Sequence, residues 1–255
     1  MKNIVHLALC AHLLAACNII PGESNVDSDL FKNPNLNKSL YVSLIDFWSF
    51  DEPSNGNRIS YNNLILSDKY SNVARINGIN GGGVNCSAAT DVILENTNVD
   101  YSMDATDDFS LAFWARQVQP PPGTGPHYIT HTNGPLSIQV GDFDMGSDDT
   151  DIELQWGNNT YQFLDVMSRG GSDFEHFTFV VDQTSLSVTL YKDGAYHSEH
   201  TIVSSSFSIT HFTICNSTIG SSNFLGELDS FGMWSRQLTQ SEISELATGT
   251  TSLDY

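Results

Sequence analysis

Hydrophobic and polar residues alternate with a period of two along much of this chain. The clearest example is residues 109–116, where Phe109, Leu111 and Phe113 point to one side and Trp114 points to the other. Because successive side chains of a β-strand lie on opposite faces of the sheet, this alternation predicts a strand with one face in a core.

Similar short runs follow one another with turn residues between them, and no internal repeat is visible. We predict further strands at residues 41–50, 73–77, 92–99, 127–131, 136–141, 174–182, 186–191, 195–203 and 224–234. Asp193-Gly194 separates two of these runs, and this dipeptide is a strong hairpin signal because glycine accepts a positive φ. The pattern predicts an all-β chain of about a dozen strands in a sandwich.

One short helix is predicted directly after the last strand. Thr239 and Glu242 have the spacing of a capping box, in which each side chain satisfies a free backbone N–H at the helix start. Ile243 and Leu246 give the helix one apolar face, and Gly249 supplies a residue that can end it.

The strand and helix at the C-terminus together resemble the closing signature of the LamG-like jelly-roll domains, which have the concanavalin A-like fold. The matching residues are Gly226, Leu228, Asp229, Phe231, Met233, Trp234, Arg236, Leu238, Thr239, Glu242, Ile243 and Leu246. The resemblance implies a two-sheet antiparallel jelly-roll β-sandwich with a short C-terminal helix, which we assign to residues 41–255. It says little about function, since one fold supports many activities.

The N-terminus reads as an export signal. Lys2 is followed by a mostly apolar run that is too short to span a bilayer, and the run ends in Leu-Ala-Ala before Cys17. This ending matches a bacterial lipobox, so we expect residues 1–16 to be a lipoprotein signal peptide, Cys17 to be lipidated, and residues 17–40 to form a flexible tether. Asn18 favours the outer membrane as the site of the anchor. An ordinary secretory signal cut near Ala16 is the alternative.

The chain carries 10 basic and 30 acidic residues, a formal net charge of −20. Such a charge argues against partners that are nucleic acids or anionic membrane surfaces, because both would be repelled. The membrane would therefore be reached through the lipid anchor alone. The charge is compatible with cations and with neutral glycans.

Outside the signal and the lipidation site, two cysteines remain, Cys86 and Cys215. An even number of cysteines in an oxidising compartment favours a disulfide. The resemblance supports this pairing, because it places one cysteine near an N-terminal strand and the other near a C-terminal strand that neighbours it. Two separate buried thiols are the alternative.

Two acidic groups are candidates for a structural Ca²⁺ site. The stretch 141–151 is rich in aspartate and could surround a hard cation with oxygen ligands, although it lacks the spacing of an EF-hand. Its residues are Asp142, Asp144, Asp148, Asp149 and Asp151. A solvated acidic loop is the alternative.

The second candidate pair is Asp51 and Asp229. The resemblance implies it, because in that fold class a cation often ties the first loop to the last strand. The alternative is that Asp51 begins a turn and that Asp229 caps a backbone group or pairs with Arg236.

For function, we expect non-catalytic binding of a carbohydrate or of an envelope or extracellular protein. Sugar-stacking candidates are Trp114, Tyr128 and Tyr161, whereas Trp48 and Trp234 are assigned to the core. A structural or adhesion role in the envelope is one alternative.

The other alternative is glycoside hydrolysis. Asp149, Asp151 and Glu153 alternate in a way that resembles the acidic strand of laminarinase-like hydrolases, which would use Asp149 and Glu153 as the paired carboxylates. The first position is aspartate where those enzymes have glutamate, and the shorter side chain would misplace the nucleophile.

Overall fold

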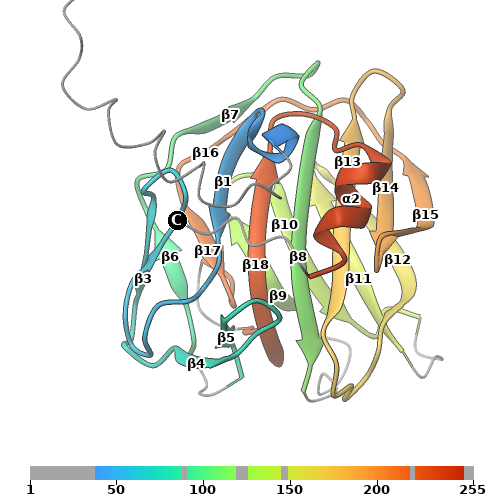
Figure 1. The fold of residues 1–255 in the computed structure, drawn as a ribbon. Helices are drawn as coiled ribbons and strands as arrows, with labels where there is room; N and C mark the ends of the chain where they lie inside the picture. The colour runs from blue at the N-terminus through green and yellow to red at the C-terminus, as the bar shows by residue number, and fades with distance from the viewer. Residues whose placement is uncertain (1–37, 88–90, 119–125, 145–148, 219–221, 250–255) are drawn as a thin grey trace, which may run out of the picture. The chain divides into compact units, whose positions relative to one another are not determined.

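Two antiparallel sheets form the two layers of the computed structural model, which describes residues 38–87, 91–118, 126–144, 149–218 and 222–249 (Figure 1). All of these residues belong to the unit Asn37–Asp254. The predicted all-β sandwich with a short C-terminal helix is confirmed.

The front sheet is the layer nearer the viewer in Figure 1. Seven of its strands are hydrogen-bonded in one path, and an eighth pairs with the far end of β18. Across the sheet they are β15 (Ala195–Thr201), β14 (Ser187–Lys192), β13 (Glu175–Asp182), β8 (Phe109–Gln117), β18 (Gly226–Trp234), β5 (Gly82–Asn85) and β4 (Ala74–Asn77), with β1 (Leu44–Trp48) beside β18.

The rear sheet also has eight strands. In order they are β12 (Asn159–Met167), β11 (Thr150–Trp156), β10 (Leu136–Gly141), β9 (His127–Thr132), β17 (Phe212–Ile214), β6 (Leu94–Asn96), β3 (Ile65–Asp68) and β2 (Arg58–Ile59). A small third sheet joins β16 (Phe207–Ile209) to β7 (Tyr101–Met103). The helices are the 3₁₀ helix η1 (Lys38–Tyr41) and the α-helix α2 (Gln240–Leu246).

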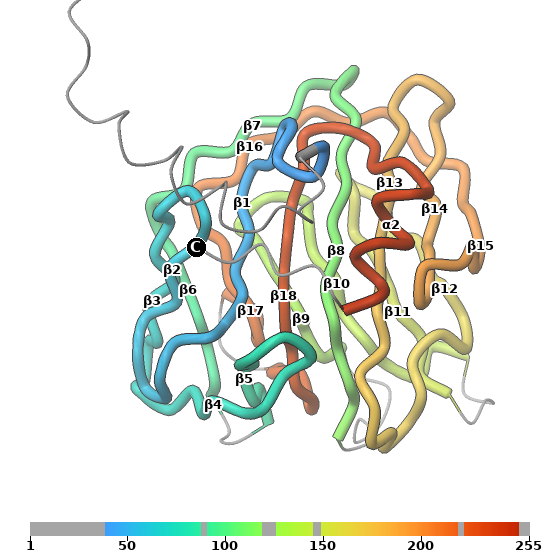
Figure 2. The backbone as a smooth tube through the Cα atoms, viewed as in Figure 1, coloured from blue at the N-terminus to red at the C-terminus, as the bar shows by residue number. Residues whose placement is uncertain are grey.

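The two ends of the described chain meet in the front sheet. β1 is antiparallel to β18, with Trp48 opposite Phe231, and the two strands run side by side in Figures 1 and 2. A bulge in β18 contains Ser230 at a φ of 52°. This extra residue lets Leu228 and Phe231, which are three positions apart, both enter the core.

The core between the sheets is built from aliphatic and aromatic side chains of both layers. It contains Trp48, Phe113, Phe177, Phe212 and Phe231, among others. The predicted burial of Trp48 and Trp234 is confirmed, since both are 0% exposed. Such apolar burial is the main favourable contribution to folding.

The predicted disulfide between Cys86 and Cys215 is present, with its two Cα atoms 5.1 Å apart. Cys86 directly follows β5 of the front sheet, and Cys215 directly follows β17 of the rear sheet. The bond therefore ties the two layers together.

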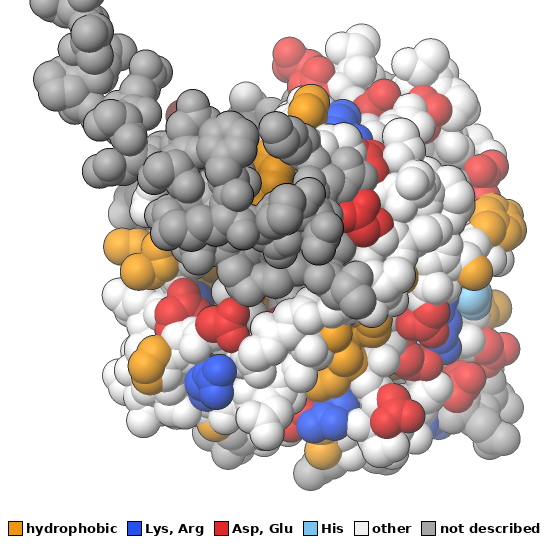
Figure 3. Space-filling view, in the orientation of Figure 1, with side chains coloured by type: hydrophobic (Ala, Val, Ile, Leu, Met, Phe, Trp, Pro, Cys, Tyr) orange, Lys and Arg blue, Asp and Glu red, His pale blue; other side chains and the backbone are white. Residues whose placement is uncertain are grey.

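Part of the outer face of the front sheet is covered by α2, which crosses in front of β8 and β13 (Figures 1 and 2). The helix has the predicted capping box of Thr239 and Glu242, and it buries Ile243 and Leu246. Figure 3 shows acidic side chains spread over this side of the molecule, with scattered basic ones among them.

Candidate functional site

The outer face of the rear sheet carries two cross-strand rows of polar side chains, which we call the polar face. The pairing register defines both rows. The short row is Tyr128, Gln139, Glu153 and Gln162, and the long row is Ser67, Glu95, Thr213, His131, Ser137, Gln155 and Thr160. Sequence reasoning named Tyr128 and Glu153 but missed the others. The strand alternation that placed apolar residues in the core also predicts these polar positions outside it.

A bulge in β9 sets the aromatic part of this face. The register between β9 and β10 shifts at Ile138 and Gln139, so that Tyr128 and His131 lie on one face although they are three residues apart. Their rings meet edge to face, with centroids 4.8 Å apart. Such a geometry is favourable for two aromatic rings and holds the Tyr128 ring in place.

Glu153 lies at the centre of the short row and is 7% exposed. The amide nitrogen of Gln139 donates to one carboxylate oxygen, and that of Gln162 donates to the other at 3.0 Å. The two glutamines therefore fix the carboxylate and satisfy it without a basic side chain.

Burial affects the two rings of the polar face. It lowers the pKa of His131, and the nearby His211 adds to this effect. Burial also raises the pKa of Tyr128, with a contribution from the charge of Glu153. Both rings are therefore neutral at pH 7, and the ring surface offered to a ligand is uncharged.

Asp151 lies on the same face of β11 as Glu153, as the alternation predicted, but its oxygens are already engaged. It is 0% exposed and accepts hydrogen bonds from the backbone N–H groups of Phe143 at 2.8 Å, Asp144 at 3.3 Å and Asp165 at 2.9 Å. Through these hydrogen bonds, Asp151 links the start of the β10–β11 connection to β12. Asp149 lies in the segment before β11 and is half-buried.

Three carboxylates of the aspartate-rich stretch, including that of Asp151, lie close together. Single oxygens of Asp142, Asp144 and Asp151 lie within 4.8 Å of one another. Asp142 also pairs with Arg169 at 2.8 Å, while its other oxygen is buried and has no hydrogen-bond partner. A buried carboxylate oxygen without a donor fits a hard cation, which would supply the missing interaction.

Asp51 and Asp229 converge on the loop between β4 and β5, as the resemblance implied. Asp229 accepts hydrogen bonds from the backbone N–H groups of Ile79 at 2.7 Å and Asn80 at 3.3 Å, and Asp51 accepts one from Gly82. Burial raises the pKa of Asp229 to about 6, and the charge of Asp51 adds to the shift although the hydrogen bonds oppose it. Backbone N–H groups thus hold both carboxylates against this loop, and a cation between them stays a prediction.

The alternative pairing of Asp229 with Arg236 is wrong, because Arg236 binds Glu242. The Asp193-Gly194 turn is confirmed. Asp193 has a φ of 50°, and its carboxylate accepts a hydrogen bond from the N–H of His176 at 2.8 Å.

The three predicted sugar-stacking residues lie at three separate places. Trp114 is 8% exposed on the outer face of the front sheet, where it meets His176 edge to face at 5.0 Å. Because α2 crosses in front of β8, the strand that carries Trp114, and the residue is nearly buried, this ring offers little surface for stacking on a sugar. The hydroxyl of Tyr161 accepts a hydrogen bond from Val203 at 3.1 Å, and its ring packs against the core. Tyr128 is therefore the one of the three that lies on the polar face.

The remaining predictions concern residues outside the described ranges. Asp148, Cys17, the signal peptide and residues 17–37 of the tether all fall there. Among the residues that the structure describes, no helix has the length and apolar character needed to cross a membrane.

Comparison with known proteins identifies the family to which the chain belongs. The family model described as the concanavalin A-like lectin/glucanases superfamily matches residues 88–244, which is more than half of the chain. No curated protein matches the sequence.

Several solved structures share the fold at low sequence identity. The binding domain of Paraclostridial Mosquitocidal Protein 1 is 17% identical with a TM-score of 0.57, and the match covers 81% of this chain and 52% of that one. The botulinum neurotoxin serotype D binding domain is 12% identical with a TM-score of 0.60, covering 82% and 52%. This chain thus spans about half the length of those two domains.

A third match covers nearly the whole of its partner. Domain 4 of AbnA, an extracellular arabinanase from Geobacillus stearothermophilus solved in complex with arabinotriose, is 17% identical with a TM-score of 0.54. The match covers 80% of this chain and 98% of that domain.

Proposed function

Because this chain belongs to the concanavalin A-like lectin/glucanases superfamily, we propose that it is a non-catalytic binding protein whose polar face takes a neutral carbohydrate. The observation that carries the proposal is the composition of that face. It combines the Tyr128 ring, held by His131, with the amides of Gln139, Gln155 and Gln162.

The chemistry of these groups matches that of a sugar. Amides and hydroxyls both donate and accept hydrogen bonds, as sugar hydroxyls do, while an aromatic ring offers a flat apolar surface to the C–H side of a sugar ring. The net charge of −20 disfavours an anionic ligand and tolerates a neutral one. Arabinotriose bound to the arabinanase domain supports a carbohydrate as the ligand class.

Binding is favoured over glycoside hydrolysis by the state of the carboxylates. Hydrolysis needs two carboxyl groups on either side of the scissile bond, one of which must accept or donate a proton. Of the two candidate carboxylates, Glu153 accepts an amide hydrogen on each oxygen, and Asp149 lies in the segment before β11. Asp151, between them in the sequence, is held by three backbone N–H groups. The bonds to Glu153 and Asp151 give these two groups structural roles.

A screen of the purified protein against immobilised glycans tests the proposal. We expect retention on neutral glycans and none on sulfated or sialylated ones. Retention on anionic glycans alone would contradict the charge argument. Release of reducing ends from a β-glucan, lost in Glu153→Gln, would instead favour a hydrolase.

A divalent cation is a second part of the proposal. Asp142, Asp144 and Asp151 would hold Ca²⁺ through carboxylate oxygens, and the partnerless oxygen of Asp142 is the observation that supports this site. The cation would be structural, because it would brace the β10–β11 connection at the edge of the polar face.

We also propose that the protein is exported and anchored through a lipid on Cys17, facing the periplasm or the cell surface. The lipobox-like ending of the apolar run supports this address. Mass spectrometry of the mature N-terminus tests it. An N-terminal Asn18 or an unmodified Cys17 would rule out the anchor.

A further inference from the structure

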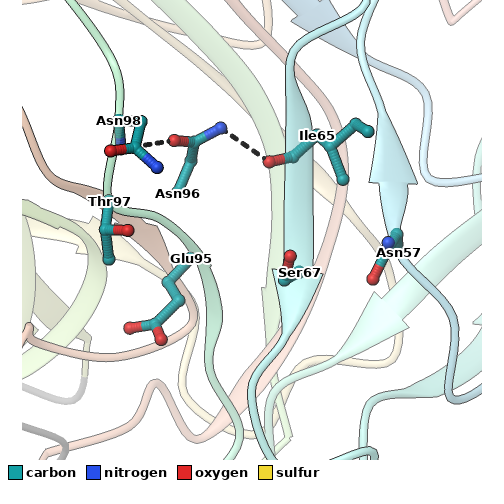
Figure 4. Close-up of a pocket in the computed structure, with 7 residues that line it drawn as sticks. All are labelled: Asn57, Ile65, Ser67, Glu95, Asn96, Thr97 and Asn98. Carbon is teal, nitrogen blue, oxygen red and sulfur yellow. Dashed lines mark hydrogen bonds between the residues drawn. The ribbon is translucent and has the colours of Figure 1, made fainter.

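A pocket with a volume of about 320 Å³ opens at the β2–β3 end of the rear sheet (Figure 4). It is lined by Asn57, Ile65, Ser67, Glu95, Asn96, Thr97 and Asn98. This volume lies at the lower end of the range for small-molecule sites, which suits one small ring.

The wall of the pocket is fixed by Asn96. Its amide nitrogen donates to the carbonyl of Ile65 at 2.8 Å, and its side-chain oxygen accepts from the backbone N–H of Asn98 at 2.7 Å, as Figure 4 shows. Asn96 has thus used both ends of its amide, and it holds β6 and the residues after it against β3.

Other polar groups around the pocket are free to bind. Within the described part of the chain, the side chains of Asn57, Ser67, Thr97 and Asn98 make no hydrogen bond, and all four residues are exposed. Two amides and two hydroxyls therefore surround a space in which they can both donate and accept. The Ile65 side chain, which is 44% exposed, adds an apolar surface.

The charge in the pocket is already balanced. Glu95 pairs with Lys69 at 3.0 Å and with His211 at 3.3 Å. A cationic ligand would have to compete with these partners, and an anionic ligand would meet a carboxylate on a strongly acidic protein. The groups that remain suit a neutral, polyhydroxylated ring.

The pocket lies at the β3 end of the long row of the polar face. Ser67 and Glu95 are the first two members of the long row, which reaches His131 on β9. Three strand spacings separate β3 from β9, a distance of roughly 14 Å. An extended oligosaccharide that lies across the strands can thus contact Tyr128 and also enter the pocket.

We propose that this pocket is a second subsite, which takes a neutral sugar residue of the glycan that lies against Tyr128. The inference rests on the proposed function. It adds that the protein selects for glycan length, because short ligands reach one subsite and longer ligands reach both.

Calorimetric titration with linear β-1,3-glucan, xylan and arabinan oligosaccharides of two to six residues tests the subsite. For the wild type, affinity should rise with chain length in at least one series. The double variant Asn57→Ala/Asn98→Ala should bind the six-residue ligand at least fivefold more weakly and the two-residue ligand unchanged. Gln240→Ala, which removes an exposed amide from α2, is the matched control and should behave as the wild type.

The outcomes separate the two proposals. If the wild type binds and the double variant keeps the full gain in affinity with length, the subsite is wrong and the proposed function stands. If the wild type binds none of the three series, the proposed function is overturned and the subsite with it.

Discussion

Arg236 and Glu242 form a bidentate ion pair, with two nitrogen–oxygen distances of 2.8 Å. The same guanidinium donates to the carbonyls of Ser39 at 2.7 Å and Val42 at 2.8 Å, while Glu242 completes the capping box with Thr239. One pair therefore fastens α2 to the first described residues of the chain.

Breaking this pair should destabilise the protein. Glu242→Gln leaves a half-buried guanidinium without its charged partner, so we expect the free energy of unfolding to fall by about 2 kcal/mol. Chemical denaturation measures the change. Ser241→Ala, at an exposed position of the same helix, should shift stability by less than about 0.5 kcal/mol. Equal stability of Glu242→Gln and the control would show that the Arg236–Glu242 ion pair does not stabilise the folded protein.

The ion pair also predicts an acid dependence. Burial alone would raise the pKa of Glu242, but its bonds to Arg236, Ser39 and Thr239 bring it to about 2. Because the folded pKa lies below the unfolded value, the stabilisation is complete above about pH 4.5 and is lost as pH falls toward 2. The stability difference between the wild type and Glu242→Gln should shrink over that window. A difference that stays constant from pH 6 to pH 2.5 would contradict the assignment.

Asp229 predicts the opposite trend. Its folded pKa of about 6 lies above the unfolded value, so the folded state holds the proton more tightly. The stabilisation is therefore present below about pH 4 and is lost as pH rises through 6, by roughly 3 kcal/mol in total. Asp229→Asn keeps an acceptor for Ile79 and Asn80 without the charge.

Denaturation of the wild type and Asp229→Asn from pH 4 to pH 7.5, in EDTA, measures this effect. The variant should gain stability relative to the wild type as pH rises. Asp100→Asn, at an exposed position, serves as the control. A stability difference that does not change with pH would mean that folding does not raise the pKa of Asp229.

The fold was largely predictable because its signals are local. The alternation in β8, the Asp193-Gly194 turn and the capping box each involve a few neighbouring residues, and the structure has all three. The resemblance then placed Cys86 near Cys215 and Asp51 near Asp229, across more than a hundred residues.

The site was less predictable because it depends on packing between distant segments. Alternation put Trp114 on the face opposite the core, but it did not show that α2 covers this face in front of β8 and β13. The β9 bulge brings Tyr128 beside His131, but no glycine or other turn residue in this strand predicts a bulge from the sequence. The sequence placed Asp151 in an aspartate-rich stretch, but it did not show that the backbone N–H groups of residues 143, 144 and 165 donate to its carboxylate.

The disulfide should contribute a large share of the stability. Cys86 and Cys215 are separated by 129 residues, and closing a loop of that length stabilises a fold by about 5 kcal/mol on the chain-entropy model. Cys86→Ala/Cys215→Ala should lower the free energy of unfolding by about that amount. The same change should follow reduction of the wild type, and reduction should leave the double variant unaffected. A double variant as stable as the oxidised wild type would contradict this.

Calcium should raise the thermal stability through the Asp142 cluster. Because a ligand that binds the native state alone stabilises it, saturating Ca²⁺ should increase the Tm of the wild type by several degrees, and EDTA should reverse the increase. Asp142→Asn should abolish the response, whereas Asp100→Asn should keep it. A response that persists in Asp142→Asn and disappears in Asp229→Asn would move the cation to the Asp51–Asp229 pair.

The most direct test of the account is the affinity of Tyr128→Ala for a neutral glycan that the wild type binds. We expect a loss of at least tenfold in calorimetric titration, because the alanine removes the flat ring that His131 holds on the polar face. Tyr196→Ala, which removes a 62% exposed ring from β15 of the front sheet, should bind as the wild type does. If Tyr128→Ala binds the glycan as tightly as the wild type, the polar face is not the carbohydrate site.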